Sequence, residues 1–103
     1  MISLLMALAL QTTSPVFLSG NQLLEHCSNS DNAQLRAGCA FYVMGVSDTL
    51  RASGATTACP PRDITGIQAT DVVIRFLRDN PQYRHMSAAS LVVGALQSAF
   101  PCR

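Results

Sequence analysis

The segment from Gly38 to Leu50 constrains the fold most, because it is the most apolar run in the interior of the chain. On this segment and just before it, apolar side chains recur at steps of three and four residues, which is the spacing of one helical face: Leu35, Cys39, Tyr42, Val43, Val46 and Leu50. Phe41 and Met44 lie outside this stripe, so more than half of the circumference is apolar. We therefore predict a long helix over residues 33–52 at the centre of a small helical domain.

Polar capping residues and prolines delimit three further helices, which we expect over residues 22–28, 66–79 and 88–100. Thr65 and Gln68 have the spacing of a capping box at the start of the second of these. Strand-like alternation nowhere extends beyond five residues. The sequence therefore predicts an all-α fold, a small domain of four or five helices.

The expected core faces of the last two helices are apolar stripes: Ile67, Thr70, Val73, Ile74 and Leu77 on the first, and Leu91, Val92, Ala95, Leu96 and Ala99 on the second. Gly38 and Gly45 lie one heptad apart on the long helix, where two glycines let another backbone approach closely. We expect Gly45 to be a close-packing point, either within the monomer or at a dimer seam.

Length and charge restrict the class of protein. A chain of 103 residues is one domain, and with 13% charged and 49% hydrophobic residues it can form a compact core. The formal net charge is +1, and the seven basic residues are all arginines distributed along the chain. Without a basic run or basic residues interleaved with aromatics, a nucleic-acid partner is not expected.

The N-terminus resembles an export signal. Residues 2–10 are almost entirely apolar, and Ala7-Leu8-Ala9 is a small-x-small cleavage site. We predict that residues 1–10 are a removable signal peptide, with cleavage at any point up to about residue 20. The alternative is a buried N-terminal helix. Since a bilayer span needs about 20 apolar residues, we expect no membrane span after signal removal. A single helical domain over residues 20–103 remains.

Four cysteines in a short exported chain indicate two disulfides: Cys27, Cys39, Cys59 and Cys102. They permit three pairings. Helices joined by short connections are antiparallel neighbours, which favours Cys27–Cys39 between the first two helices. The same reasoning brings the chain's end back to the start of the third helix and favours Cys59–Cys102.

The sequence contains no recognisable catalytic constellation. His26 and Cys27 are adjacent, but neighbouring helical residues point about 100° apart, and a disulfide would consume the thiol. His85 has no second histidine or paired carboxylate at metal-ligand spacing, and a capping role fits it better. For Asp48 we expect a paired carboxylate or one that faces a helix N-terminus. We therefore predict a protein that is not an enzyme and that has no metal site and no cofactor.

Several motifs together resemble one family. The first helix has a Gly-Asn-x-Leu-x-x-x-Cys pattern from Gly20 to Cys27, and the second a Cys-x-x-Tyr-x-x-Gly-x-x-Asp pattern from Cys39 to Asp48. Further matching positions are Cys59-Pro60, Gln68, Asp71-Val72-Val73, Leu77, Pro81, Arg84-His85, Ala88-Ala89, Leu91-Val92 and Phe100-Pro101-Cys102. This pattern is similar to the Rap/Tai immunity-protein family associated with type VI secretion. The resemblance extends from about Gly20 to Cys102.

The resemblance implies a small, all-α, disulfide-bonded protein of the Gram-negative periplasm, often a homodimer. It also implies a protein partner, since characterised members bind and block a peptidoglycan-cleaving amidase effector. Inhibition there uses a protruding loop placed in the active-site cleft of the effector. By exposure and composition, the first candidate for that loop is Ser53, Gly54, Ala55, Thr56, Thr57 and Ala58, and the second is Gln82, Tyr83, Arg84 and His85.

Two other functions compete with this hypothesis. A periplasmic helical binding protein or holdase, with an unknown partner, would expose apolar surface on acidification. The low charge and the two histidines give little leverage for such a pH response. A cysteine enzyme that uses Cys27 and His26 requires a free thiol.

Overall fold

The computed structural model describes residues 16–54 and 57–103, and the predicted signal segment, residues 1–10, lies outside them. Four α-helices and one short 3-10 helix make up the described fold: α2 (Gly20–Ser28), α3 (Ala33–Ala52), α4 (Gly66–Asp79), η1 (Pro81–Tyr83) and α5 (Ala88–Ala99). Within these residues there is no strand, only one isolated bridge between Ser19 and Ser87. The predicted all-α fold is confirmed.

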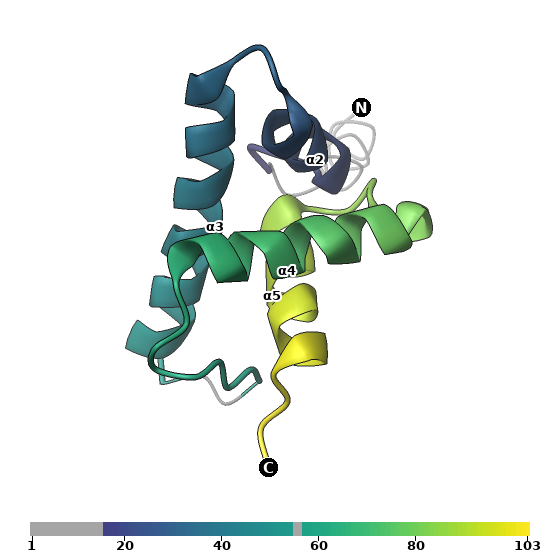
Figure 1. Ribbon diagram of the computed structural model, residues 1–103. Helices are drawn as coiled ribbons and strands as arrows, with labels where there is room; N and C mark the ends of the chain where they lie inside the picture. Colours follow the sequence, from purple (N-terminus) through teal and green to yellow (C-terminus); the bar gives the residue numbers. More distant parts are fainter. Residues whose placement is uncertain (1–15, 55–56) are drawn as a thin grey trace, which may run out of the picture.

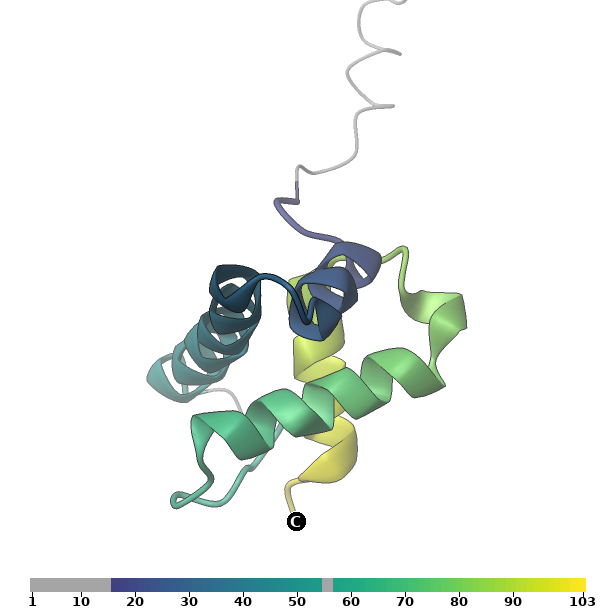
Figure 2. The ribbon, with the colours of Figure 1, turned by 45° about the horizontal axis from the view of Figure 1, so that its top comes forward.

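The helices surround a small core (Figure 1). α4 crosses α5 steeply, α3 flanks the pair on one side, and α2 lies at the end where α5 begins. Figure 2 shows the same crossing from a second direction. The expectation that the last two helices lie antiparallel is therefore wrong, because the connection through η1 turns the chain before α5 begins.

Side-chain caps define the helix starts. Thr65 and Gln68 form the predicted capping box, with Gln68 N donating to Thr65 Oγ1 at 3.1 Å and Thr65 N to Gln68 Oε1 at 2.9 Å. Ser19 and Gln22 form a second box at α2, which begins two residues earlier than predicted for that reason. The start of α5 is capped by Ser87, whose Oγ accepts from Ser90 N.

The central helix is α5, not α3. α5 contributes the largest set of buried side chains: Ala88, Leu91, Val92, Ala95 and Leu96. α3 buries only Cys39 and Val43, and Phe41 is 69% exposed. The prediction for α3 was wrong because an apolar helix surface need not be covered, and here part of it lines a surface groove.

Two predicted core positions also lie outside. Ile67 is 74% exposed and Ala99 is exposed, whereas Ala69 is buried beside Thr70, Val73 and Leu77. Ile67 is in the first turn of α4 and points about a quarter of a turn away from that buried stripe. Ala99 is in the last turn of α5 and lines an open hollow beside α4.

Close packing occurs at glycines other than those predicted. A Cβ built on Gly38 or Gly45 has no other atom within 4 Å, so Gly45 is not a close-packing point within the monomer. A Cβ on Gly20, in contrast, would lie 2.9 Å from the carbonyl oxygen of Arg84 and would collide with Leu91. A Cβ on Gly66 would meet the flexible side chain of Met44.

The N-terminal end of α2 is attached to the segment before α5. Ala88 N donates to Leu18 O at 2.9 Å, Gly20 N to Met86 O at 2.9 Å, and Asn21 N to Arg84 O at 2.8 Å. This ladder explains the tight position of Gly20, because the two backbones lie side by side there.

Both predicted disulfides are present. Cys27–Cys39 joins α2 to α3 with a Cα–Cα distance of 5.1 Å, and Cys59–Cys102 joins the segment before α4 to the C-terminus with 5.0 Å. All four cysteines are thus paired. None of the helices in the described part of the chain has the length and hydrophobicity required to cross a bilayer.

Gly20→Ala should destabilise the protein by about 1–3 kcal/mol, because the new methyl group meets backbone that cannot move without breaking the ladder. Gly38→Ala is the matched control and should be neutral or stabilising by up to about 1 kcal/mol, since it adds helix propensity in open space. Urea denaturation of both variants measures the difference. Equal free energies of unfolding would contradict the proposed role of the Gly20 contact.

Replacing Cys59 and Cys102 by alanine should lower the free energy of unfolding by about 4 kcal/mol in the chain-entropy model. The bridge spans 43 residues of sequence, whereas Cys27–Cys39 spans 12, for which the same model gives about 3 kcal/mol. Because Cys39 is only 1% exposed, replacing it with alanine also removes buried contacts and lowers the free energy of unfolding further. The test is thermal and urea unfolding of both double variants; an unchanged midpoint would refute the expected stabilisation.

Candidate functional site

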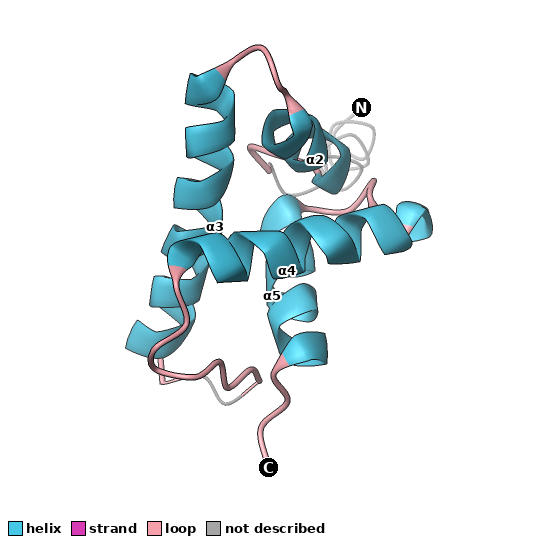
Figure 3. Cartoon of the chain, viewed as in Figure 1, coloured by secondary structure: helices cyan, strands magenta, loops and turns pink. Residues whose placement is uncertain are grey.

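The connection between α3 and α4 is the longest in the described fold and forms an exposed edge (Figure 3). α3 ends where Gly54 adopts a φ of 70°, a conformation that suits glycine. Ser53 Oγ donates to Leu50 O at 2.9 Å and completes the helix end. At the other end of the loop, Cys59 N donates to Phe100 O at 2.8 Å beside the Cys59–Cys102 disulfide. Both described ends of this segment, at Ser53 and at Cys59, are therefore held by the fold.

The first predicted contact segment is only partly available to a partner. Ser53, Gly54 and Thr57 are exposed, and Ala55 and Thr56 lie outside the described residues. Ala58 is 8% exposed and belongs to the core, because the adjacent bridge holds it against the domain. We therefore remove Ala58 from the set of candidate contact residues.

The second predicted segment contains both exposed and structural side chains. Gln82, Tyr83 and His85 are exposed, Tyr83 by 46%. Arg84 is half-buried: its Nη1 donates to Leu77 O at 3.4 Å near the end of α4, and its Nε is buried without a partner. Its carbonyl oxygen accepts from Asn21 N. Arg84 thus holds this turn in place. The side chains of Tyr83 and His85 are exposed, and that of Gln82 is exposed and donates to Asn80 Oδ1 at 3.3 Å.

The fold does not bring these two segments together. η1 lies at one end of α4, whereas the connection after α3 leads to the other end (Figures 1 and 2). A single narrow protrusion into an active-site cleft can therefore contain one of the two segments and not both.

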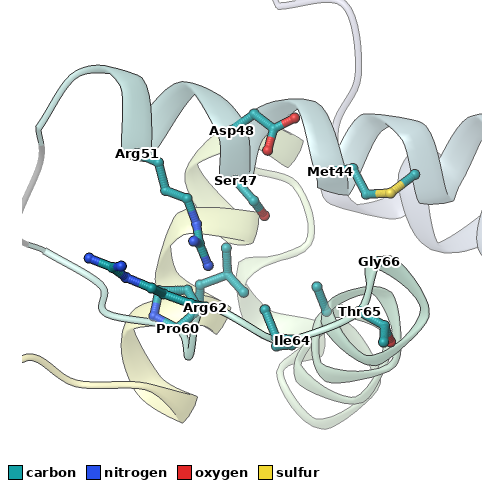
Figure 4. Close-up of a pocket in the computed structure, with 11 residues that line it drawn as sticks. Met44, Ser47, Asp48, Arg51, Pro60, Arg62, Ile64, Thr65 and Gly66 are labelled. Atoms are coloured by element: carbon teal, nitrogen blue, oxygen red, sulfur yellow. The ribbon is translucent and has the colours of Figure 1, made fainter.

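Beside the first loop lies a cleft of about 280 Å³ between the C-terminal half of α3 and the start of α4 (Figure 4). Apolar and polar side chains line it: Met44, Ser47, Asp48, Arg51, Pro60, Arg62, Ile64, Thr65, Gly66, Ala69 and Leu96. Arg51 Nη2 donates to Pro61 O at 3.0 Å and so links α3 to the loop. Sequence reasoning missed this cleft, because its lining comes from α3, the loop, α4 and α5.

A second concavity, of about 480 Å³, is an apolar groove between α3 and α5. Its lining contains no charged residue: Phe41, Tyr42, Gly45, Val46, Thr49, Leu50, Ala89 and Val93. Partial burial raises the pKa of the Tyr42 phenol, and a hydrogen bond with the backbone of Ala89 acts in the opposite direction. The sequence signal for this groove was Phe41, one of the two apolar side chains outside the expected core stripe of α3.

The residues with catalytic potential do not converge. Cys27 is in a disulfide, so the pair with His26 has no thiol to act as a nucleophile. In the described ranges, no three His, Cys, Asp or Glu side chains lie close enough together to hold a metal ion. Asp48 and His85 are exposed. The surface features are therefore a loop, a cleft and a groove, which are suited to binding.

Comparisons with known proteins agree with the motif resemblance. A search among curated proteins found no match to this chain. A family model described as Rap1a immunity proteins matches residues 19–102. The matched region begins at the N-cap of α2 and ends at Cys102, so it includes every helix of the described fold and both disulfides. With more than half of its length matched, this chain belongs to the family of Rap1a immunity proteins.

Proposed function

We propose that this protein acts in the periplasm as an immunity protein that binds and inhibits a peptidoglycan amidase effector of type VI secretion. The observation that carries the proposal is the family match over residues 19–102. Immunity proteins act by binding a protein effector, and the exposed loop, cleft and groove are surfaces suited to a protein partner. The amidase is the effector class implied by the motif resemblance.

Two disulfides support an extracytoplasmic location. Such bonds form and persist in oxidising compartments such as the bacterial periplasm and are rare in the cytosol. The predicted signal peptide over residues 1–10 agrees with this compartment. Peptidoglycan is also there, so an inhibitor of a cell-wall amidase would meet its target in the same space.

The loop after α3 is our first choice for the inhibitory contact. Its ends are fixed by the cap at Ser53 and by the bridge at Cys59. Because the ends are already fixed, the loop loses less conformational entropy when it binds a partner. The side chain of Thr57 is exposed on it. The Gln82–His85 segment is the second choice.

The apolar groove supports a homodimer. The side chain of Phe41 on α3 is 69% exposed. It lies one helical turn before Gly45, where an added Cβ would meet open space. Two copies related by a two-fold axis would each place Phe41 against the groove of the other, since such an interface uses the same patch on both subunits. The dimer seam thus remains the proposed role for Gly45.

The direct test is rescue of a cell that exports a type VI amidase effector, and the product of the neighbouring gene is the first candidate to examine. Co-expression of the immunity protein with its signal should restore growth, and the purified chain should abolish peptidoglycan cleavage by that amidase. Binding measured by calorimetry with no inhibition, or no binding to the amidase at all, would reject the proposal.

Thr57→Arg should weaken inhibition of the amidase by at least about tenfold if the first loop enters the active site, because a long charged side chain does not fit the same space. Gln82→Arg is the matched variant on the second segment and should leave inhibition unchanged. Titration of amidase activity measures both, with the melting temperature as a folding control. The reverse result would assign the contact to the second segment.

Phe41→Asp should convert the dimer to monomer without loss of the fold, because the side chain is mostly exposed within one copy. Ile67→Asp is the matched control on α4, where an equally exposed side chain lies outside the groove. Gly45→Leu should also lower dimerisation and keep its melting temperature, since nothing lies within 4 Å of the added Cβ. Sedimentation measures the mass; a monomeric wild type would rule out the homodimer.

A further inference from the structure

The cleft beside the first loop has an arrangement of charge that points to one kind of partner surface. Arg51 and Arg62 both line it, against the single carboxylate of Asp48. Figure 4 shows the side chains of Ser47 and Arg51 directed from α3 toward the loop, whereas the Asp48 carboxylate lies level with α3 itself. The other acidic residue nearby in sequence, Asp63, does not line the cleft but lines an adjoining hollow, which shares Ile64 with it. The lining of the cleft is therefore net positive.

The inner wall of the cleft is apolar. Met44, Ile64 and Leu96 line it together with Ala69, next to the first residues of α4. A space of about 280 Å³ accepts one or two side chains and not a folded element. The combination of an apolar wall and a guanidinium rim suits a side chain that has a short methylene stem and a carboxylate at its tip, because arginine binds carboxylates in a planar, two-pronged geometry.

The two arginines differ in what they are free to do. Arg51 already donates one hydrogen bond to Pro61 O, so it fixes the loop and keeps its remaining donors for a ligand. Arg62 is exposed on the loop itself, three residues after Cys59, at a position fixed by the bridge to Cys102. The loop side of the cleft thus begins at Pro60, next to the bridge that also ends the proposed inhibitory loop.

We propose that this cleft is a specificity site that receives a glutamate side chain from an acidic segment of the protein effector, with Arg62 and Arg51 binding its carboxylate. This inference rests on the proposed function in that the partner is a protein effector. It adds the chemical character of the partner's surface: an acidic residue that enters beside the loop after α3. Because the site has charged groups at its rim, it contributes specificity and association rate.

The first experiment needs no effector. The probe is a capped peptide of alternating glycine and glutamate, titrated into isotope-labelled protein, with the peptide of alternating glycine and glutamine as its control. Backbone amide signals of Arg62, Ile64 and Gly66, which line the cleft, should shift in a saturable way with the glutamate peptide only. The shifts should decrease as salt is raised from about 50 to about 300 mM, since ions screen exposed charges.

Arg62→Glu tests the assignment, and Arg75→Glu, on the outer face of α4 and outside the cleft, is the matched control. Arg62→Glu should weaken peptide binding by at least about tenfold, whereas Arg75→Glu should leave it within about twofold. Melting temperatures of both variants verify folding. Absence of saturable shifts at the cleft, equal shifts with the glutamine peptide, or equal loss in both variants would overturn the proposal.

The same two variants separate this inference from the proposed function. Against the amidase, Arg62→Glu should slow association and weaken inhibition, and Arg75→Glu should not. If the amidase binds Arg62→Glu as tightly as wild type, the acidic-residue site is wrong and the immunity function stands. If the amidase does not bind the wild type while the glutamate peptide does, the amidase assignment is wrong and the cleft's preference for carboxylates stands.

Discussion

The structure depends on the fixed point at Cys59. A disulfide joins this residue to Cys102, and the backbone N–H of Cys59 donates to Phe100 O. These two bonds hold together the ends of the segment that contains α4, η1 and α5. A domain of this size buries a small core, and a cross-link over 43 residues removes many conformations from the unfolded chain. The same point lies between the two parts of the candidate site, because the loop after α3 ends at it and the lining of the cleft continues from Pro60.

The second constraint is the backbone ladder between residues 18–21 and 84–88. It places the start of α2 against the turn before α5, at the opposite end of the molecule from the exposed loop. Gly20 permits this close approach because it lacks a Cβ. Arg84 stabilises it, because its carbonyl oxygen accepts from Asn21 N and its guanidinium donates to Leu77 O. Of the residues near η1 that match the family's pattern, Arg84 thus has a structural role, whereas His85 is exposed.

Sequence periodicity predicted the elements well because helix starts and ends are local. Thr65, Gln68 and Ser87 cap the helices that they were expected to cap. Both predicted disulfides are present, although the antiparallel arrangement from which Cys59–Cys102 was inferred is not the one observed. Periodicity was less successful with packing. Periodicity predicted α3 as the central helix and Ile67 as a core residue, and neither prediction was correct. An apolar stripe indicates a helix face that favours burial, but it does not show which neighbouring element covers that face.

The sequence by itself thus determined the helices, their caps, the expectation of two bridges and the resemblance to the immunity-protein family, all of which depend on short-range patterns or on the number of cysteines. Only the tertiary structure decided which faces remain open. The groove at Phe41 joins side chains from α3 and α5, and the cleft joins Arg51 to Arg62 across a loop. Such surfaces arise where helices cross, and the crossing depends on side-chain packing between residues far apart in the chain.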